Sequence, residues 1–135
     1  MDFVSFEIAK KLKEKGFDEL CLAYYTNDDT LYYNYSHKPG ACYKDCYLSH
    51  NLMPKDSVSG KFVDAPIISQ VLKWLRNEKE IYCLPHFEQG IDMWLFCIER
   101  PLAGTEFAEY ISKSIYNTYE DAAIAGIEYV LDNLI

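Results

Sequence analysis

An α+β fold is predicted for this chain, with one antiparallel sheet of about four strands formed by two helix-hairpin (αββ) units and joined by a C-terminal helix. Helical periodicity of apolar residues predicts helices near residues 5–15, 66–77 and 118–134. β-forming runs on either side of short polar turns follow the first two helices and predict the hairpins. With 135 residues, of which 50% are hydrophobic, the chain can bury a core and suits a single domain over residues 1–135.

The first helix carries signals at both ends. Ser5 is a favourable N-cap, because its side-chain oxygen can accept a hydrogen bond from an unpaired N–H of the first turn. Gly16 suits the left-handed position just past the helix end, and Phe17 can then pack back on Leu12, as in a Schellman motif. The runs "LCLAYYT" and "LYYNY" follow on either side of "NDD" and predict the first hairpin.

Residues 36–64 differ from the rest of the chain. They hold Pro39, Gly40, Pro54 and Gly60 and show no sustained periodicity. A connection of this length without secondary structure is uncommon in a compact domain. We therefore predict a long functional loop or an insertion here, with room for a short helix around "ACYKDCYLSH".

The second helix and hairpin are predicted from similar signals. Pro66 fits the first turn of the helix at 66–77. A hairpin is expected around Gln89-Gly90, and Pro85 places its strand at a sheet edge because proline has no N–H to donate. Residues 91–98 are apolar on both alternating faces apart from one aspartate, which is typical of a central strand covered on both faces.

The last third of the chain holds one ambiguous segment and one clear helix. Residues 101–117 fit either a short helix or a strand. Thr118 is a favourable cap for the final helix, and Gly126 within that helix allows a close approach to the sheet.

Charge and composition narrow the choice of partner and compartment. The formal net charge is -8, so phosphate backbones and anionic membranes are repelled, and we expect no direct nucleic-acid or membrane binding. A basic protein partner remains compatible with this charge. The stretch "MDFVSFEIAKKLKEKGF" does not have the pattern of a signal peptide, and no apolar run approaches the ~18 residues of a membrane span. We expect a cytoplasmic protein.

The sharpest chemical pattern is "HKPGACYKDCYLSH", which holds His37, Cys42, Cys46 and His50. Cysteine and histidine at short spacings can ligate zinc. On one straight helix, however, Cys42 and His50 would lie ~12 Å apart, so a compact site needs a neighbouring pair together with His37. No second cysteine pair at zinc-ribbon spacing occurs. A polar surface loop is the competing interpretation, and we expect no bound cofactor.

The remaining cysteines and the absent motifs disfavour an enzyme. Cys21, Cys83 and Cys97 each lie in an apolar, strand-like run, which is typical of small core residues. The sequence contains no nucleophile elbow, P-loop, G-x-G-x-x-G or H-E-x-x-H motif. A Cys/His-dependent enzyme or a small metal-binding protein centred on residues 37–50 stays open as the alternative function.

Tyrosine is unusually frequent, with twelve in the chain. The stretch "AYYTNDDTLYYNY" alone carries five of them, namely Tyr24, Tyr25, Tyr32, Tyr33 and Tyr35. Because strand side chains alternate between faces, these rings cannot all point into one core. Tyrosine combines a large apolar ring with a polar tip, which suits interfaces. The leading hypothesis is a non-enzymatic protein-interaction module that binds a partner or self-associates through this hairpin.

A resemblance is carried by three blocks: "VSFEIAKKLKEKGFDE", "APIISQVLKWLRNEKEIY" and "TYEDAAIAGIEYVLDNLI". Over about half of its length, the chain resembles a family of small uncharacterised proteins found in gut bacteria and their prophages. This resemblance implies a small cytoplasmic accessory protein of mobile-element origin. It supplies no catalytic residues, and the Cys/His stretch lies outside the three blocks.

Overall fold

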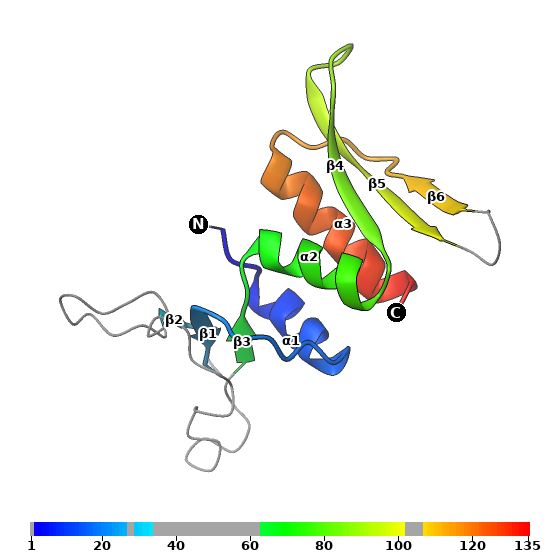
Figure 1. Cartoon of the computed structure of the whole chain (residues 1–135). Helices are drawn as coiled ribbons and strands as arrows, with labels where there is room; N and C mark the ends of the chain where they lie inside the picture. The colour runs from blue at the N-terminus through cyan, green and yellow to red at the C-terminus, as the bar shows by residue number, and fades with distance from the viewer. Residues whose placement is uncertain (1, 27–28, 34–62, 102–106) are drawn as a thin grey trace, which may run out of the picture. The chain divides into compact units, whose positions relative to one another are not determined.

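The computed structural model describes residues 2–26, 29–33, 63–101 and 107–135 (Figure 1). These residues form three helices and two three-stranded antiparallel sheets, so the α+β class is confirmed. The chain divides into two compact units, and each is described by itself. The first unit comprises essentially Phe3–Ile67, and the second comprises Ile68–Ile135 with Asp2.

Helix α1 (Phe6–Glu14) begins and ends as its local sequence predicts. The Ser5 side chain accepts a hydrogen bond from the backbone N–H at the N3 position, 3.3 Å away. At the other end Gly16 has a φ of 92°, in the left-handed region that glycine adopts most easily. The N–H of Phe17 donates to the carbonyl of Leu12 at 3.0 Å, which is the long bond of a Schellman motif.

The first sheet has the order β2-β1-β3, with β1 at Ala23–Tyr25, β2 at Leu31–Tyr33 and β3 at Val63–Ala65. The predicted hairpin corresponds to β1 and β2. Strand β3 includes the last two residues of the predicted loop at 36–64, so that end of the segment is strand rather than loop. The rest of the predicted loop, residues 36–62, lies outside the described residues.

Tyr25 is a core residue of the first unit. Its side chain is buried, and its hydroxyl donates a hydrogen bond to the carbonyl of Val4, 2.6 Å away. Its ring meets the ring of Phe6 edge-on, with 5.6 Å between the centroids. The hydroxyl therefore joins the sheet to the segment that leads into α1.

We expect Tyr25→Phe to lower the free energy of unfolding by about 1–3 kcal/mol, because the carbonyl of the fully buried Val4 loses this donor. Urea denaturation measures the change. Tyr32→Phe is the matched control, since Tyr32 is 46% exposed, and it should shift stability by no more than about 0.5 kcal/mol. Equal losses in both variants would contradict a structural role for the Tyr25 hydroxyl.

The two helices of the second unit differ in how well their starts were predicted. Helix α3 (Tyr119–Asn133) begins after Thr118, whose side chain accepts a hydrogen bond from an N–H of the first turn at 3.0 Å. Helix α2 (Ile68–Glu78) begins two residues later than predicted. The placement of Pro66 in its first turn is wrong, because Pro66 precedes the helix and its carbonyl accepts a hydrogen bond from the N–H of Val4, both residues lying within the first unit.

The second sheet has the order β4-β5-β6, with β4 at Tyr82–Glu88, β5 at Met93–Pro101 and β6 at Phe107–Ile111. Pro85 lies on β4, at an edge of this sheet, as predicted. The turn between β4 and β5 contains Gln89-Gly90, and β5 is the central strand, both as predicted. The predicted cover on both faces of β5 is wrong, because Phe96 and Ile98 are buried on one face while Cys97 on the other is only half-buried. The ambiguous segment is resolved as strand β6 because it pairs with β5.

The prediction of one sheet with about four strands is wrong for the described residues, which form two sheets. Each hairpin acquires a third strand: β3 comes from a distant segment and pairs with β1, whereas β6 follows β5 along the chain and pairs with it. Both edges of each central strand are thereby occupied within its own unit. Local periodicity contains no information on such long-range pairing.

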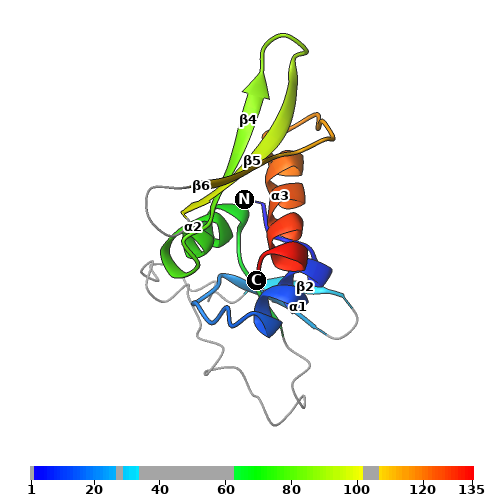
Figure 2. The same cartoon turned by 90° about the vertical axis from the view of Figure 1, so that its right-hand side faces the viewer.

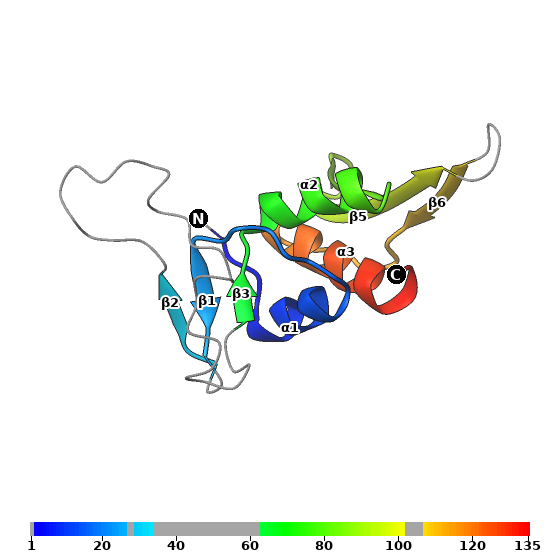
Figure 3. The same ribbon diagram turned by 60° about the horizontal axis from the view of Figure 1, so that its bottom comes forward.

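Helix α3 packs across β4 and β5, and α2 lies beside it (Figures 2 and 3). Gly126 sits at the closest point of this packing. A Cβ atom there would lie 2.5 Å from Sγ of Cys83 and 3.2 Å from Cγ of Phe96. The predicted close approach of Gly126 to the sheet is therefore confirmed.

No helix in the described ranges is both long enough and apolar enough to cross a membrane.

Candidate functional site

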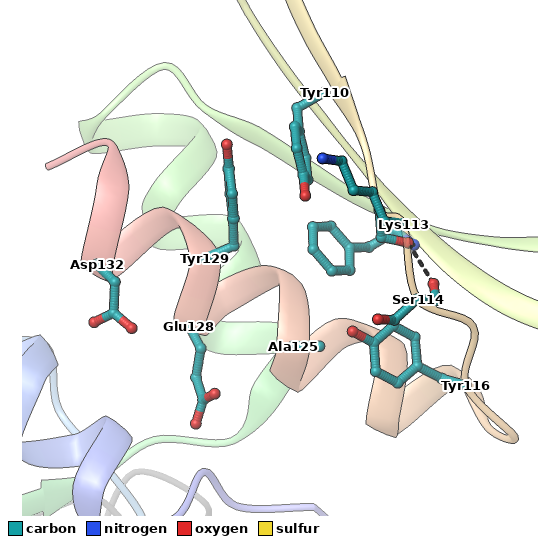
Figure 4. Close-up of a pocket in the computed structure, with 10 residues that line it drawn as sticks. Tyr110, Lys113, Ser114, Tyr116, Ala125, Glu128, Tyr129 and Asp132 are labelled. Carbon is teal, nitrogen blue, oxygen red and sulfur yellow. Dashed lines mark hydrogen bonds between the residues drawn. The ribbon is translucent and has the colours of Figure 1, made fainter.

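A pocket of about 280 Å³ opens between α3 and the sheet of the second unit (Figure 4). Its lining combines aromatic rings with a polar rim. The lining residues are Phe96, Tyr110, Ser112, Lys113, Ser114, Tyr116, Ala125, Glu128, Tyr129 and Asp132. Strands β5 and β6, the segment after β6, and α3 all contribute, so the pocket exists only once these elements have packed. We call it the aromatic pocket.

One wall comes from a bulge in the chain after β6. Ser112 continues the ladder, because its N–H donates to the carbonyl of Phe96 at 2.9 Å. Tyr116 and Trp94 then exchange two backbone hydrogen bonds of 2.7 and 2.8 Å. Four positions separate Ser112 from Tyr116, whereas their partners on β5 are only two apart. Residues 113–115 must therefore bulge out of the ladder, and this bulge contributes Lys113 to the pocket rim.

The Ser112 side chain holds the bulge in place. Its hydroxyl accepts a hydrogen bond from the N–H of Phe96 at 3.1 Å and donates one to the carbonyl of Ser114 at 2.9 Å. The hydroxyl thus uses both its acceptor and its donor on backbone groups. These two hydrogen bonds fix the bulge relative to β5, because one joins Ser112 to Phe96 of β5 and the other joins it to Ser114 within the bulge.

The aromatic rings form a connected cluster. Tyr110 of β6 and Tyr129 of α3 are stacked, with centroids 4.1 Å apart and planes within 10°. The Phe96 ring lies 6.0 Å from each of them and 6.2 Å from Tyr116. Phe96 itself is only 4% exposed, whereas the three tyrosines are half-buried. A buried phenylalanine therefore fixes three tyrosine rings that still reach the pocket.

Three charged residues also line the pocket. Glu128 and Asp132 are exposed on α3 and, with Ala125, occupy one helix face at spacings of three and four residues. Lys113 approaches from the bulge, on the side of Tyr110 (Figure 4). Two carboxylates against one ammonium give the rim a net negative charge. The faces of aromatic rings also carry negative potential, so the pocket as a whole favours a cationic group.

The size of the aromatic pocket limits what can enter it. Its volume lies just below the roughly 300–1,000 Å³ typical of small-molecule sites. A group the size of one side chain fits such a space better than a nucleotide or a flavin.

The structure places the tyrosines predicted for binding in different environments. Tyr24 and Tyr32 stack across β1 and β2, with 5.6 Å between their centroids and 20° between their planes. Tyr25 faces the core of the first unit. Tyr35 and the side chain of Tyr33 lie outside the described residues. Only the stacked pair is therefore placed at a surface, and its role in binding stays a prediction.

The predicted metal ligands, His37, Cys42, Cys46 and His50, also lie outside the described residues. Within the part of the chain that the structure describes, no group of three or more His, Cys, Asp or Glu side chains is arranged to hold a metal ion.

The described cysteines are buried or half-buried thiols, and their raised pKa values keep them protonated at neutral pH. Cys21 and Cys83 are buried, as predicted, whereas Cys97 is only half-buried. Burial raises the pKa of Cys83 to about 12, with a smaller contribution from Cys97. Burial, together with Asp64, also raises the pKa of Cys21. Such thiols are poor nucleophiles, because the reactive species is the thiolate.

These pKa shifts predict a stability that falls in alkaline solution. In the unfolded chain a thiol ionises near pH ~8.5, whereas Cys83 stays protonated up to a pKa of about 12 in the folded state. The stabilisation is therefore complete below pH ~8.5 and decreases as the pH rises toward 12. Between pH ~8.5 and ~9.5 each such thiol should approach a slope of about 1.4 kcal/mol per pH unit. Chemical denaturation across this range measures the total slope.

Cys83→Ala is the control for the alkaline slope. The substitution changes the absolute stability, but the test concerns the slope, which should decrease by the contribution of one thiol. A slope that the variant shares with the original chain would contradict the assignment to Cys83.

The aromatic pocket was not predicted from the sequence. Tyr110 and Tyr116 fall in the segment that fitted helix and strand equally well, and no sequence signal singled out Tyr129 in the final helix. A usable signal existed in the alternation of Tyr110 and Ser112 along one face of a strand. Tyr129, three positions after Gly126, then lies on the adjacent part of the helix surface.

No family model, curated protein or solved structure matches this chain. The resemblance to the prophage-associated family therefore stays a prediction.

Proposed function

We propose that this protein is a small non-enzymatic binding module that receives a cationic side chain of a protein partner in its aromatic pocket. The observation that carries the proposal is the combination of four aromatic rings with Glu128 and Asp132 at the rim. A cation over ring faces gains about 0.5–2 kcal/mol, and nearby carboxylates add to this attraction.

Arginine is the side chain that fits this pocket best. Its planar guanidinium stacks on aromatic faces and donates hydrogen bonds in a fork that matches a carboxylate. The net charge of -8 on the chain supports a basic partner, because it draws cationic surfaces into encounter. A buried aromatic or arginine anchor in a pocket also dominates the energy of many protein interfaces.

Two features favour binding over catalysis. The Ser112 hydroxyl accepts from one backbone group and donates to another, so it is not poised as a nucleophile. The pKa values of the described thiols are raised, which disfavours a thiolate nucleophile. The protein would act in the cytoplasm as an accessory module, in keeping with the mobile-element resemblance, and the Tyr24–Tyr32 pair would add a further contact surface.

Titration with a small arginine derivative tests the proposal. Nα-acetyl-arginine amide, added to the ¹⁵N-labelled full chain, should shift the amide signals around Tyr110, Tyr116 and Tyr129. The shifts should saturate with a Kd on the order of 1 mM or weaker, as expected for one side chain. Nα-acetyl-citrulline amide has nearly the same shape without the charge and should bind much more weakly. Equal binding of both compounds would refute cation recognition.

A further inference from the structure

The sheet of the second unit has a second face, opposite the face that packs on α3. Strand alternation places the buried Phe96 and Ile98 on the α3 side, so their neighbours point to the other side. We call this other side the outer face. Its described members are Tyr82, Leu84, His86, Glu88, Met93, Leu95, Cys97, Glu99, Glu109 and Ile111.

An apolar row crosses all three strands of the outer face. Leu84 pairs with Cys97, and Cys97 pairs with Ile111, so the three side chains lie in one line across the sheet. Leu84 is 43% exposed and Ile111 is 52% exposed. Leu95 and Met93 extend the apolar surface along β5. A sheet face with this composition is characteristic of an interaction site.

The adjacent row carries an uncompensated negative charge. Glu99 and Glu109 lie directly opposite each other on β5 and β6, beside Tyr82 on β4. Like charges in this arrangement destabilise a strand pair. Neither carboxylate forms an ion pair with a cation among the described residues. A cation supplied by a partner would relieve this repulsion.

We propose that the outer face binds an amphipathic helix of a basic protein partner. The apolar stripe of that helix would lie along the Leu84–Cys97–Ile111 row, and its lysine or arginine side chains would lie over Glu99 and Glu109. Three strands span about 10 Å between the outermost axes, so a helix laid along this row would contact it over about two turns. A second copy of this chain fits poorly, because it would bring another charge of -8 and the same pair of carboxylates.

This inference is independent of the proposed function. The aromatic pocket lies on the α3 side of the sheet, and neighbouring residues such as Tyr110 and Ile111 point to opposite sides. Loss of binding at one face therefore leaves the other proposal intact.

The test uses a labelled synthetic helical peptide of about 18 residues, with leucines along one face and lysines on the flanks. Fluorescence anisotropy with the full chain measures its affinity. A scrambled peptide of the same composition is the first comparison, and it should bind at least about tenfold more weakly because it cannot present an apolar stripe. A peptide with glutamate in place of lysine should not bind detectably.

Variants of the protein locate the contact. Leu84→Thr with Ile111→Thr should weaken binding about tenfold by removing apolar contact. Glu99→Gln with Glu109→Gln should weaken binding and reduce its salt dependence. A matched control, Glu14→Gln with Asp18→Asn, makes the same change in net charge on exposed residues of the first unit and should change affinity less than twofold.

Circular dichroism of each variant verifies that the fold is retained. Three results would overturn the inference: the scrambled peptide binds as tightly, the Leu84/Ile111 variant binds as tightly, or the chain dimerises in a way that the same variant abolishes. The last result would assign the outer face to a second copy.

Discussion

Gly126→Ala is expected to lower the free energy of unfolding by about 1 kcal/mol, although alanine is the better helix former. The added methyl group would lie 2.5 Å from Sγ of Cys83, where real Cβ atoms essentially never lie. Both Cys83 and the neighbouring Phe96 are buried, so neither can move aside into solvent. Overpacking of this kind costs about 1–3 kcal/mol, and the gain in helix propensity of about 1 kcal/mol offsets only part of it.

Gly90→Ala is the matched control for this prediction. No atom lies within 4 Å of a Cβ built at Gly90, so the substitution should be close to neutral. The double variant Gly126→Ala with Cys83→Ala should lose less stability than the sum of the two single variants, because the closest clash is absent. If Gly126→Ala stabilises the chain as an ordinary helical alanine does, α3 does not pack on the sheet as described.

Glu128→Gln combined with Asp132→Asn is expected to weaken arginine binding about tenfold while leaving the fold unchanged. Each exposed carboxylate contributes about 0.2–1 kcal/mol to the binding of a cation, so the pair accounts for roughly one order of magnitude. Both side chains are exposed on α3, and their amides have nearly the same shape. Repeating the titration with Nα-acetyl-arginine amide measures the loss.

Glu14→Gln with Asp18→Asn removes the same number of charges from exposed residues of the first unit that do not line the aromatic pocket. This control separates local attraction at the rim from the general effect of net charge. Unchanged affinity in the Glu128/Asp132 variant, or equal losses in variant and control, would contradict recognition at the rim.

Helix ends were the most predictable part of the fold, because their signals are local. Ser5 and Thr118 cap the helices that follow them, and Gly16 adopts the left-handed conformation that its position requires. Each signal depends on a few adjacent residues. Pro66 shows the limit of such reasoning, because a hydrogen bond to the distant Val4 determines its place.

Sheet assembly was less predictable. The periodicity of residues 107–111 fitted a helix as well as a strand until pairing with β5 resolved it. Strand β3 was hidden at the end of a segment without periodicity, and it completes the first sheet only by pairing with β1. The β1–β3 pairing joins residues that are far apart in sequence, so no local pattern specifies it. The β5–β6 pairing is local, but the periodicity of residues 107–111 alone does not reveal it.

The candidate site illustrates the same limit. Composition predicted a binding surface at "AYYTNDDTLYYNY", where the tyrosines are densest. The aromatic pocket instead joins single tyrosines from β6, the residue directly after the bulge and α3 around the buried Phe96. Because each element contributes only one ring, the cluster appears only after the elements have packed.

Intermolecular nuclear Overhauser effects test the central claim, cation recognition in the aromatic pocket, most directly. With the full chain and saturating Nα-acetyl-arginine amide, the side-chain methylene protons of the ligand should give cross-peaks to the ring protons of Tyr110, Tyr116 and Tyr129. These rings line the pocket that the guanidinium would enter. Cross-peaks confined to other surfaces, or none at saturation, would contradict the account.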